Sequence, residues 1–274
     1  MNGAGVSTPD VVRPNPCVGS PLPWREPAQG LVIDDGGDPR NARADLRRLA
    51  VQQRQVARGE PLYRQGDPMC ALYEVLEGQF KSDHVDARGR HQITSFNLTG
   101  ELLGLDGLGT GRHCVDVVAL ETACVRLFPY SGVKGLLQES AAFRVAFNKI
   151  MGHEIVRDQA MMLLLGTMAA EGRIAAFVID LGLRLSANGR SAPVLLLHMS
   201  RLEIGSYLGL TLETVSRTLS KLRRDGVIDI DRRQLQVTDA PALRLIAQRG
   251  GGRCGPMGTQ QVCAASRVEP AEVL

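Results

Sequence analysis

The chain has 274 residues, of which 44% are hydrophobic and 4% aromatic, and its formal net charge at pH 7 is +3. This length is enough for two domains with real cores, while the few aromatic residues argue against a protein that stacks sugars or bases. No apolar run is long enough to span a membrane, and the N-terminus lacks the pattern of a secretory signal. We therefore expect a cytoplasmic protein without a membrane partner.

Both ends of the chain differ in composition from its centre. Residues 1–42 hold seven of the 14 prolines, and residues 246–274 are rich in glycine. These compositions predict a flexible N-terminal arm and a flexible C-terminal tail. Cys254 and Cys263 in the tail could be oxidised or bind metal, but their spacing is not a recognised metal-ligand pattern.

Between 43 and 130 the sequence alternates short β-type runs with glycines, as in LYEVLEGQFKSDHV and RHQITSFNLTGELLGL. Alternation of apolar and polar residues is typical of half-buried strands, and ARGR at 87–90 predicts a turn between two of them. Many short strands at regular spacing favour a compact antiparallel barrel or jelly roll.

From 131 to 168 the apolar period becomes that of a helix. Six positions recur at steps of four and three, the spacing of a coiled-coil seam: Phe147, Met151, Ile155, Asp158, Met162 and Leu165. A charge such as Asp158 inside a seam costs stability and commonly fixes register or partner choice. We favour a dimerisation helix shared by two parallel copies; a core helix within one chain is the alternative.

The segment 169–245 opens with a helical stretch, EGRIAAFVIDLGLRL, followed by two shorter helices. Ser200 and Glu203 form a capping box before the first of these, Gly209 permits a sharp turn, and Thr211 can cap the second. Two short helices joined by such a turn form a helix-turn-helix. GVIDIDRRQLQVT then alternates as a β-hairpin with DRR at its turn, so we predict a winged helix.

The second short helix, TLETVSRTLSKLRRDG, separates an apolar side from a polar side at about 100° per residue. The apolar side is expected to comprise Leu212, Val215, Leu219 and Leu222. The polar side is expected to comprise Glu213, Ser216, Arg217 and Ser220. Such a helix is held from behind by its leucines and presents hydrogen-bonding groups to something outside the domain.

The polar side matches what a DNA major groove offers. Arg217 can bond guanine O6 and N7, Glu213 can accept from cytosine N4, and Ser216 can meet a thymine methyl or a base edge. Glu213 and Arg217 can also brace each other, and an ordinary surface salt bridge is the alternative interpretation. Contacts to phosphates, which supply affinity rather than sequence preference, are expected from Thr211, Ser220, Lys221, Arg223, Arg224, Arg232 and Arg233.

The stretch MSRLEIGSYLGLTLETVSRTLSKLRRDGVI resembles the DNA-binding module of the CRP/FNR family of bacterial transcription regulators, and its E-x-x-S-R motif is similar to that of the FNR branch. The resemblance extends upstream through GEPLYRQGD, LYEVLEGQFK and EIVRDQAMMLLL. It implies an α+β chain with a cyclic-nucleotide-binding-type β-roll (jelly roll) over 43–130, a dimerisation helix over 131–168 and a winged helix-turn-helix over 169–245.

The same resemblance implies a homodimer that reads an inverted repeat in double-stranded DNA, with half-sites about one helical turn apart. Leu212 and Ser216 replace the arginine and glycine of the cyclic AMP receptor branch, so the implied site is TTGAT, four spacer bases and ATCAA. The regulator would act at promoters as an activator that contacts RNA polymerase, or by blocking the polymerase.

The FNR branch senses oxygen with a [4Fe–4S] cluster, on which four thiolates must converge. The cysteines of this chain are widely spaced and only one precedes the roll: Cys17, Cys70, Cys114, Cys124, Cys254 and Cys263. Arg126 stands where the FNR pattern has its roll cysteine. We therefore expect no [4Fe–4S] cluster.

Cyclic AMP binding in the family uses the glutamate of a Gly-Glu-Leu segment for the ribose and an Arg-Ser or Arg-Thr pair for the phosphate. Here Gly100-Glu101-Leu102 comes too early in the sequence, and Leu105 stands at the ribose position. Arg112 is followed by His113 rather than by a hydroxyl residue. The pattern argues against cyclic AMP.

Three alternatives for the signal stay open. A haem-based gas sensor would take its iron ligand from His84, His91, His113 or Cys114. A thiol switch would use Cys70, Cys114 or Cys124. The simplest interpretation is a regulator that needs no ligand and acts whenever it is made.

The rival from another class is a ligand-binding adaptor with a vestigial DNA-binding domain. An enzyme is the least supported class, because no nucleophile–base arrangement, metal-ligand spacing or phosphate-binding loop stands out in the sequence.

Overall fold

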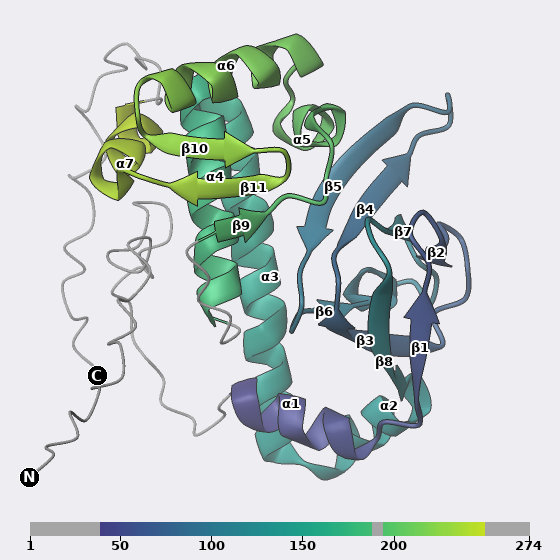
Figure 1. Ribbon diagram of the computed structural model, residues 1–274. Coiled ribbons are helices and arrows are strands. Elements are labelled where there is room, and N and C mark those ends of the chain that lie inside the picture. The colour runs from purple at the N-terminus through teal and green to yellow at the C-terminus, as the bar shows by residue number, and fades with distance from the viewer. Residues whose placement is uncertain (1–38, 188–193, 250–274) are drawn as a thin grey trace, which may run out of the picture.

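The computed structural model describes residues 39–187 and 194–249 (Figure 1). Most of the expected arm and tail, with Cys17, Cys254 and Cys263, therefore lies outside the described residues. Residues 39–42 and 246–249, which the sequence analysis placed in the arm and tail, belong instead to helices α1 (Pro39–Arg48) and α7 (Ala240–Arg249).

The N-terminal half forms an antiparallel β-roll of two four-stranded sheets, as expected. One sheet has the order β1-β8-β3-β6 and the other β2-β7-β4-β5. The first contains β1 (Gln52–Val56), β8 (Ala123–Pro129), β3 (Ala71–Glu77) and β6 (Leu102–Leu103). The second contains β2 (Pro61–Tyr63), β7 (Asp116–Ala119), β4 (Phe80–Val85) and β5 (His91–Asn97). A short 3₁₀ helix, η1 (Leu105–Gly107), follows β6.

The predicted turn at 87–90 joins β4 to β5, with Phe80 opposite Asn97 and Val85 opposite His91 in the ladder. The alternation of the strands fills the interior of the roll with apolar side chains. This core includes Val56, Leu62, Val75, Phe80, Val117 and Val125.

Two helices follow the roll: α2 (Tyr130–Glu139) and the long α3 (Ala141–Thr167). Ser140 separates them, and its side chain caps α3 by accepting from the backbone N–H of Phe143. α1, which the sequence analysis missed, packs on α3 at the end remote from the C-terminal domain (Figure 1). Phe143, Phe147 and Ile150 of α3 are buried there with Leu46 of α1.

The C-terminal part has the predicted winged-helix architecture. α4 (Ala170–Ala187) is followed by β9 (Val194–Leu196), α5 (Arg201–Leu208) and α6 (Leu212–Arg224). β10 (Ile228–Asp231) and β11 (Gln234–Val237) form the predicted hairpin, and β9 adds a third strand beside β11. α7, which the sequence analysis also missed, packs against α4.

The roll and the C-terminal part share one apolar core, in which Phe96 of β5 packs edge-on against Tyr207 of α5. Polar contacts reinforce this junction: Lys81 Nζ lies 2.8 Å from Glu203 Oε1, and the backbone N–H of Ile93 donates to Ser206 Oγ at 3.0 Å. The first helix of the helix-turn-helix is thereby fixed on the β4–β5 hairpin.

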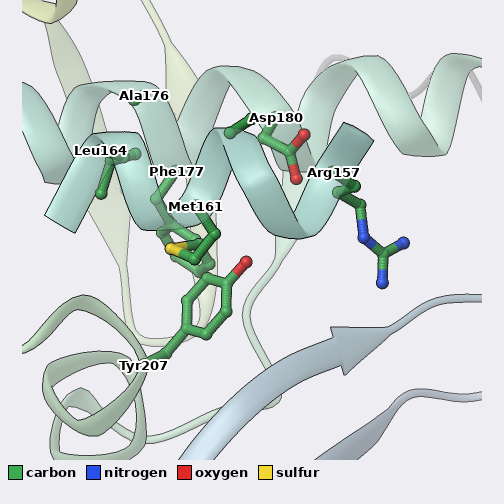
Figure 2. Close-up of a pocket in the computed structure, with 8 residues that line it drawn as sticks. Arg157, Met161, Leu164, Ala176, Phe177, Asp180 and Tyr207 are labelled. Atoms are coloured by element: carbon green, nitrogen blue, oxygen red, sulfur yellow. The ribbon is translucent and has the colours of Figure 1, made fainter. Parts of the chain in front are cut away.

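Figure 2 shows a small cavity of about 40 Å³ where α3, α4 and α5 meet. Tyr207 points its hydroxyl from α5 toward α3, and Arg157 projects from α3 toward the roll. Burial of the Tyr207 ring raises the pKa of its hydroxyl to about 12. None of the described helices is both long and apolar enough to cross a membrane.

Candidate nucleic-acid interface

Local hydrogen bonds begin and end both helices of the helix-turn-helix. The Ser200 hydroxyl accepts from the Glu203 N–H at 3.2 Å, and the Glu203 carboxylate accepts from the Ser200 N–H at 2.7 Å, which completes the predicted capping box. Gly209 ends α5 with φ of 62°, the left-handed conformation that glycine adopts without steric cost. Thr211 caps α6 by accepting from the N–H of Thr214.

α6 is anchored by three of the four predicted apolar residues. Val215, Leu219 and Leu222 are buried, with Thr218 beside them. Leu212 was wrongly placed on this buried side, because its side chain is 48% exposed. As the first residue of α6 it lies beyond the turns that pack on the domain core.

The polar side of α6 faces outward. Glu213, Arg217 and Ser220 are exposed, and Ser216 is half-buried. Within the described part of the chain, no ion pair joins Glu213 to Arg217, although the sequence allowed the two to brace each other. Their carboxylate and guanidinium are therefore free to meet an external partner. α6 lies along the outer edge of the molecule, where nothing covers it in the described structure (Figure 1).

Several expected phosphate contacts surround this side. Arg224 at the end of α6 is exposed, and Arg232 and Arg233 form the exposed tip of the β10–β11 hairpin. Arg223 Nε lies 3.2 Å from Asp229 Oδ1. Lys221 is ion-paired with Glu171 of α4, and that pair raises the pKa of Lys221. Thr211, the cap of α6, is an exposed residue whose hydroxyl oxygen lies 2.9 Å from Oγ1 of Thr214.

An open hollow of about 650 Å³ lies beside α6. It is bordered by the start of α4 on one side and the end of α7 on another. Its charged and polar lining residues are Thr214, Arg217, Thr218, Lys221, Arg224, Arg249 and Glu171. Arg249 and Glu171 were not predicted for this site, because residues 246–249 of α7 were assigned to the tail and the start of α4 lies far from α6 in sequence.

The residues of the predicted α3 seam differ in exposure: some are buried within their own chain and others face solvent. Phe147 is buried against Phe143 in its own chain, so its surface is unavailable to a partner and its placement in a dimer interface is wrong. Met151 and Leu165 pack partly against neighbouring elements. Ile155 and Met162 are 54% and 64% exposed, and Asp158 is exposed between them.

A second cavity, of about 480 Å³, lies between the roll and α3. The roll supplies Ser82, Thr94, Asn97, Leu105 and Asp106 to its lining, and α3 supplies Glu154, Arg157 and Asp158. Asp106 accepts from the Tyr63 hydroxyl at 3.2 Å and lies 3.3 Å from Nδ1 of His113, which stacks on the Tyr63 ring. Despite its burial, these contacts and the N–H of Cys114 hold the pKa of Asp106 below its ordinary value.

The groups around this cavity do not fit a cyclic nucleotide. Glu101 is buried and ion-paired with Arg184 of α4, so its carboxylate does not line the cavity. Arg112 donates from Nη1 to the Gly66 carbonyl at 2.7 Å on the outside of the roll. Leu105, which by the family resemblance stands at the ribose position, lines the cavity and has no polar group to offer a ribose hydroxyl.

The candidate haem ligands and thiols lie in the roll, where the histidines contact protein groups. His84 is exposed near the Cys114 carbonyl, His91 pairs with Asp83 at 2.8 Å, and His113 is buried beside Asp106. Cys70 and Cys114 are exposed, whereas Cys124 is buried. Across residues 39–187 and 194–249, no three His, Cys, Asp or Glu side chains are grouped to hold a metal ion.

The architecture defines a class of protein in which a sensor-type roll and a long connecting helix precede a winged-helix DNA-binding domain in the chain. Family comparisons agree. A Crp-like helix-turn-helix domain is matched by residues 172–246, and a cyclic nucleotide-binding domain by residues 53–140.

Two transcription regulators and one solved structure are similar to this chain over most of its length. The transcriptional regulatory protein btr of Bordetella pertussis is 39% identical over 80% of this chain and 91% of its own length. The transcriptional activator protein anr of Pseudomonas aeruginosa is 38% identical over 75% of this chain and 84% of its own. The structure of FixK2 from Bradyrhizobium japonicum matches with a TM-score of 0.66 at 30% identity, covering 71% of this chain and 96% of that one. The chain belongs to the CRP/FNR family of transcription regulators.

Proposed function

We propose that this regulator binds DNA as a homodimer and recognises the inverted repeat TTGAT, four spacer bases and ATCAA. The observation that carries the proposal is the outward face of α6. Glu213 and Arg217 are exposed there, while Val215, Leu219 and Leu222 hold the helix from behind. A helix anchored in this way can enter the major groove without unfolding any part of its domain.

In the groove, Arg217 binds guanine O6 and N7 through its two-pronged guanidinium, and Glu213 accepts from the N4 amine of cytosine. Ser216, which is half-buried, meets a thymine. Thr211, Ser220 and the basic residues of α6 and the wing contact phosphates, which fix the orientation of the helix and add affinity for any sequence.

The dimer forms along the exposed part of α3. Four apolar side chains there are more than half exposed in the single chain: Ile155, Val156, Met162 and Leu163. Ile155 and Met162 are seven residues apart, as are Val156 and Leu163, so each pair falls on one side of α3 at the heptad repeat, and a second copy of α3 would cover them. Two-fold symmetry would then present two α6 helices to successive half-sites of an inverted repeat.

At a promoter the bound dimer contacts RNA polymerase and activates transcription in the cytoplasm. Support for activation comes from relatives named as transcriptional activators, among them anr of Pseudomonas aeruginosa. An abortive-initiation assay with purified polymerase and a promoter carrying the repeat measures this step.

A mobility-shift titration of the full chain tests the sequence preference. The duplexes are the intact repeat, a repeat with the G·C pair of both half-sites replaced by A·T, and a scrambled sequence of equal composition. Each replaced pair should cost about 1–3 kcal/mol in binding free energy. Equal affinity for the three duplexes at about 150 mM salt would refute the assigned site.

A further inference from the structure

The hollow beside α6 combines four cationic side chains with one carboxylate. Arg217, Lys221, Arg224 and Arg249 line it, together with Glu171 from the first turn of α4. Among the described residues, Lys221 is the one of these four cations that forms an ion pair, and its partner is Glu171. The carboxylate thus neutralises a residue that the sequence assigned to phosphate binding.

This ion pair is too exposed to serve the stability of the fold. The Lys221 and Glu171 side chains are 45% and 43% exposed. Exposed pairs of this kind contribute little to the free energy of unfolding, because water and salt screen them. A phosphate that approaches α6 can therefore replace the Glu171 carboxylate on Lys221 at small cost.

Glu171 also brings a negative charge close to the proposed DNA interface. It lines the same hollow as Arg217, which is assigned to a base. When Lys221 turns to a phosphate, Glu171 is left without its partner beside another anion. Both the occupied lysine and the exposed carboxylate oppose binding to DNA of any sequence.

We infer that Glu171 competes with DNA phosphate for Lys221 and thereby lowers the sequence-independent part of DNA affinity. This inference rests on the proposed function of α6 and adds a residue from outside the helix-turn-helix to its mechanism. Weak binding to random DNA leaves a larger share of the regulator free for its specific site, because a genome offers a great excess of nonspecific sites.

The test uses the full chain with Glu171→Gln, which keeps the size of the side chain and removes its charge. The dissociation constants for the intact repeat and for the scrambled duplex are measured from about 50 to 300 mM salt. Freeing one cation should strengthen binding to both duplexes by about fivefold per protomer at low salt. It should also steepen the slope of log K against log salt by about 0.9 per protomer.

Glu139→Gln is the matched control. Glu139 is exposed at the end of α2, at the opposite end of the molecule from α6 (Figure 1), and the substitution changes the net charge equally. It should leave affinity and slope unchanged. If E139Q strengthens binding as much as E171Q, the effect is one of net charge and the inference is wrong.

Two further variants test the role of Lys221. In a Lys221→Gln background, Glu171→Gln should raise log K by less than half as much as it does in the parent protein, because no lysine is released. An equal gain in both backgrounds, or unchanged binding by E171Q, overturns the inference. A thermal unfolding curve of each variant verifies that it is folded. Failure of the proposed repeat is a separate result, since it would remove the difference between duplexes without removing the effect of E171Q on both.

Discussion

Glu101 of the roll and Arg184 of α4 form a buried ion pair with two hydrogen bonds, from Nε to Oε1 at 2.8 Å and from Nη2 to Oε2 at 2.6 Å. Arg184 also donates to the Phe96 carbonyl and lies 3.2 Å from Asp180 Oδ2. Arg157 of α3 approaches the same carboxylate at 3.7 Å. Three parts of the molecule, the roll, the long helix and the winged helix, are thereby tied to one carboxylate.

Replacing Arg184 with methionine should lower the free energy of unfolding by about 3–5 kcal/mol, because it leaves Glu101 buried without its main counter-charge. Urea unfolding followed by far-UV circular dichroism measures the change. Arg88→Met, at an exposed site in the β4–β5 turn, is the control and should stay within about 0.5 kcal/mol of the parent. Equal losses in the two variants would show that the buried pair contributes nothing.

The same pair should make stability depend on pH. Burial disfavours the charged form of Glu101, but the charges of Arg184 and Arg157 and the hydrogen bonds from Arg184 outweigh burial and hold its pKa below the ordinary 4.5. The folded protein therefore binds the proton less readily than the unfolded chain. This contribution to stability is present above pH 4.5 and is lost as pH falls through the lower folded pKa.

Unfolding free energies measured from pH 3 to 7 should fall more steeply toward acid in the parent than in Glu101→Gln, which has no carboxylate to protonate. Since E101Q also weakens the pair, its curve should lie lower at pH 7 and converge with the parent at low pH. Parallel curves would contradict the assignment of this pH dependence to Glu101.

Replacing Gly205 with alanine should destabilise the helix-turn-helix. A Cβ at this position of α5 would lie 2.6 Å from the Leu210 carbonyl oxygen, so the turn into α6 would have to move. Overpacking of this kind costs about 1–3 kcal/mol, measurable by thermal unfolding. Gly135→Ala is the control: a Cβ there has no neighbour within 4 Å, and alanine should raise the stability of α2 slightly. A G205A protein as stable as G135A would contradict the close approach.

The sequence was sufficient to predict elements whose signals are local. The capping box of Ser200 and Glu203, the turn at Gly209 and the cap at Thr211 each depend on groups within a few residues, and the structure confirms all of them. The roll was predictable for a similar reason, because alternation and turns recur along its strands.

Features that depend on contacts between distant segments were not predictable. Phe147 fits the seam by spacing, but α1 covers this end of α3, and the first residues of α1 (39–42) belong to a segment whose prolines predicted a flexible arm. The Lys221–Glu171 and Glu101–Arg184 pairs join residues far apart in sequence. α7 did carry a local signal, since Ala240, Leu243 and Ala247 follow helical spacing and are buried.

Placing a charge on the exposed part of α3 should dissociate the proposed dimer. Met162→Glu and Ile155→Glu each put a carboxylate at a position more than half exposed in the single chain, so the fold should be retained. Sedimentation velocity should show a shift from dimer to monomer, and affinity for the inverted repeat should fall. Val51→Glu is the control, because Val51 is 68% exposed, lies just before β1 of the roll and is not part of α3, so the dimer should stay intact. A dimer that survives both α3 substitutions would place the interface elsewhere.

Arg217 distinguishes base reading from general attraction to DNA. Arg217→Ala should cost about 1–3 kcal/mol on the intact repeat and relax the preference at the guanine. Arg217→Lys keeps the charge but loses the two-pronged geometry of the guanidinium, so binding to scrambled DNA should be retained while the guanine preference falls. Arg233→Ala, at the exposed tip of the wing, should weaken all duplexes by a similar factor. Because α6 projects Arg217 into solvent with no ion-pair partner among the described residues, neither substitution at this position should alter the melting temperature. A uniform loss of affinity in R217A and R233A alike would mean that Arg217 contacts phosphate rather than a base.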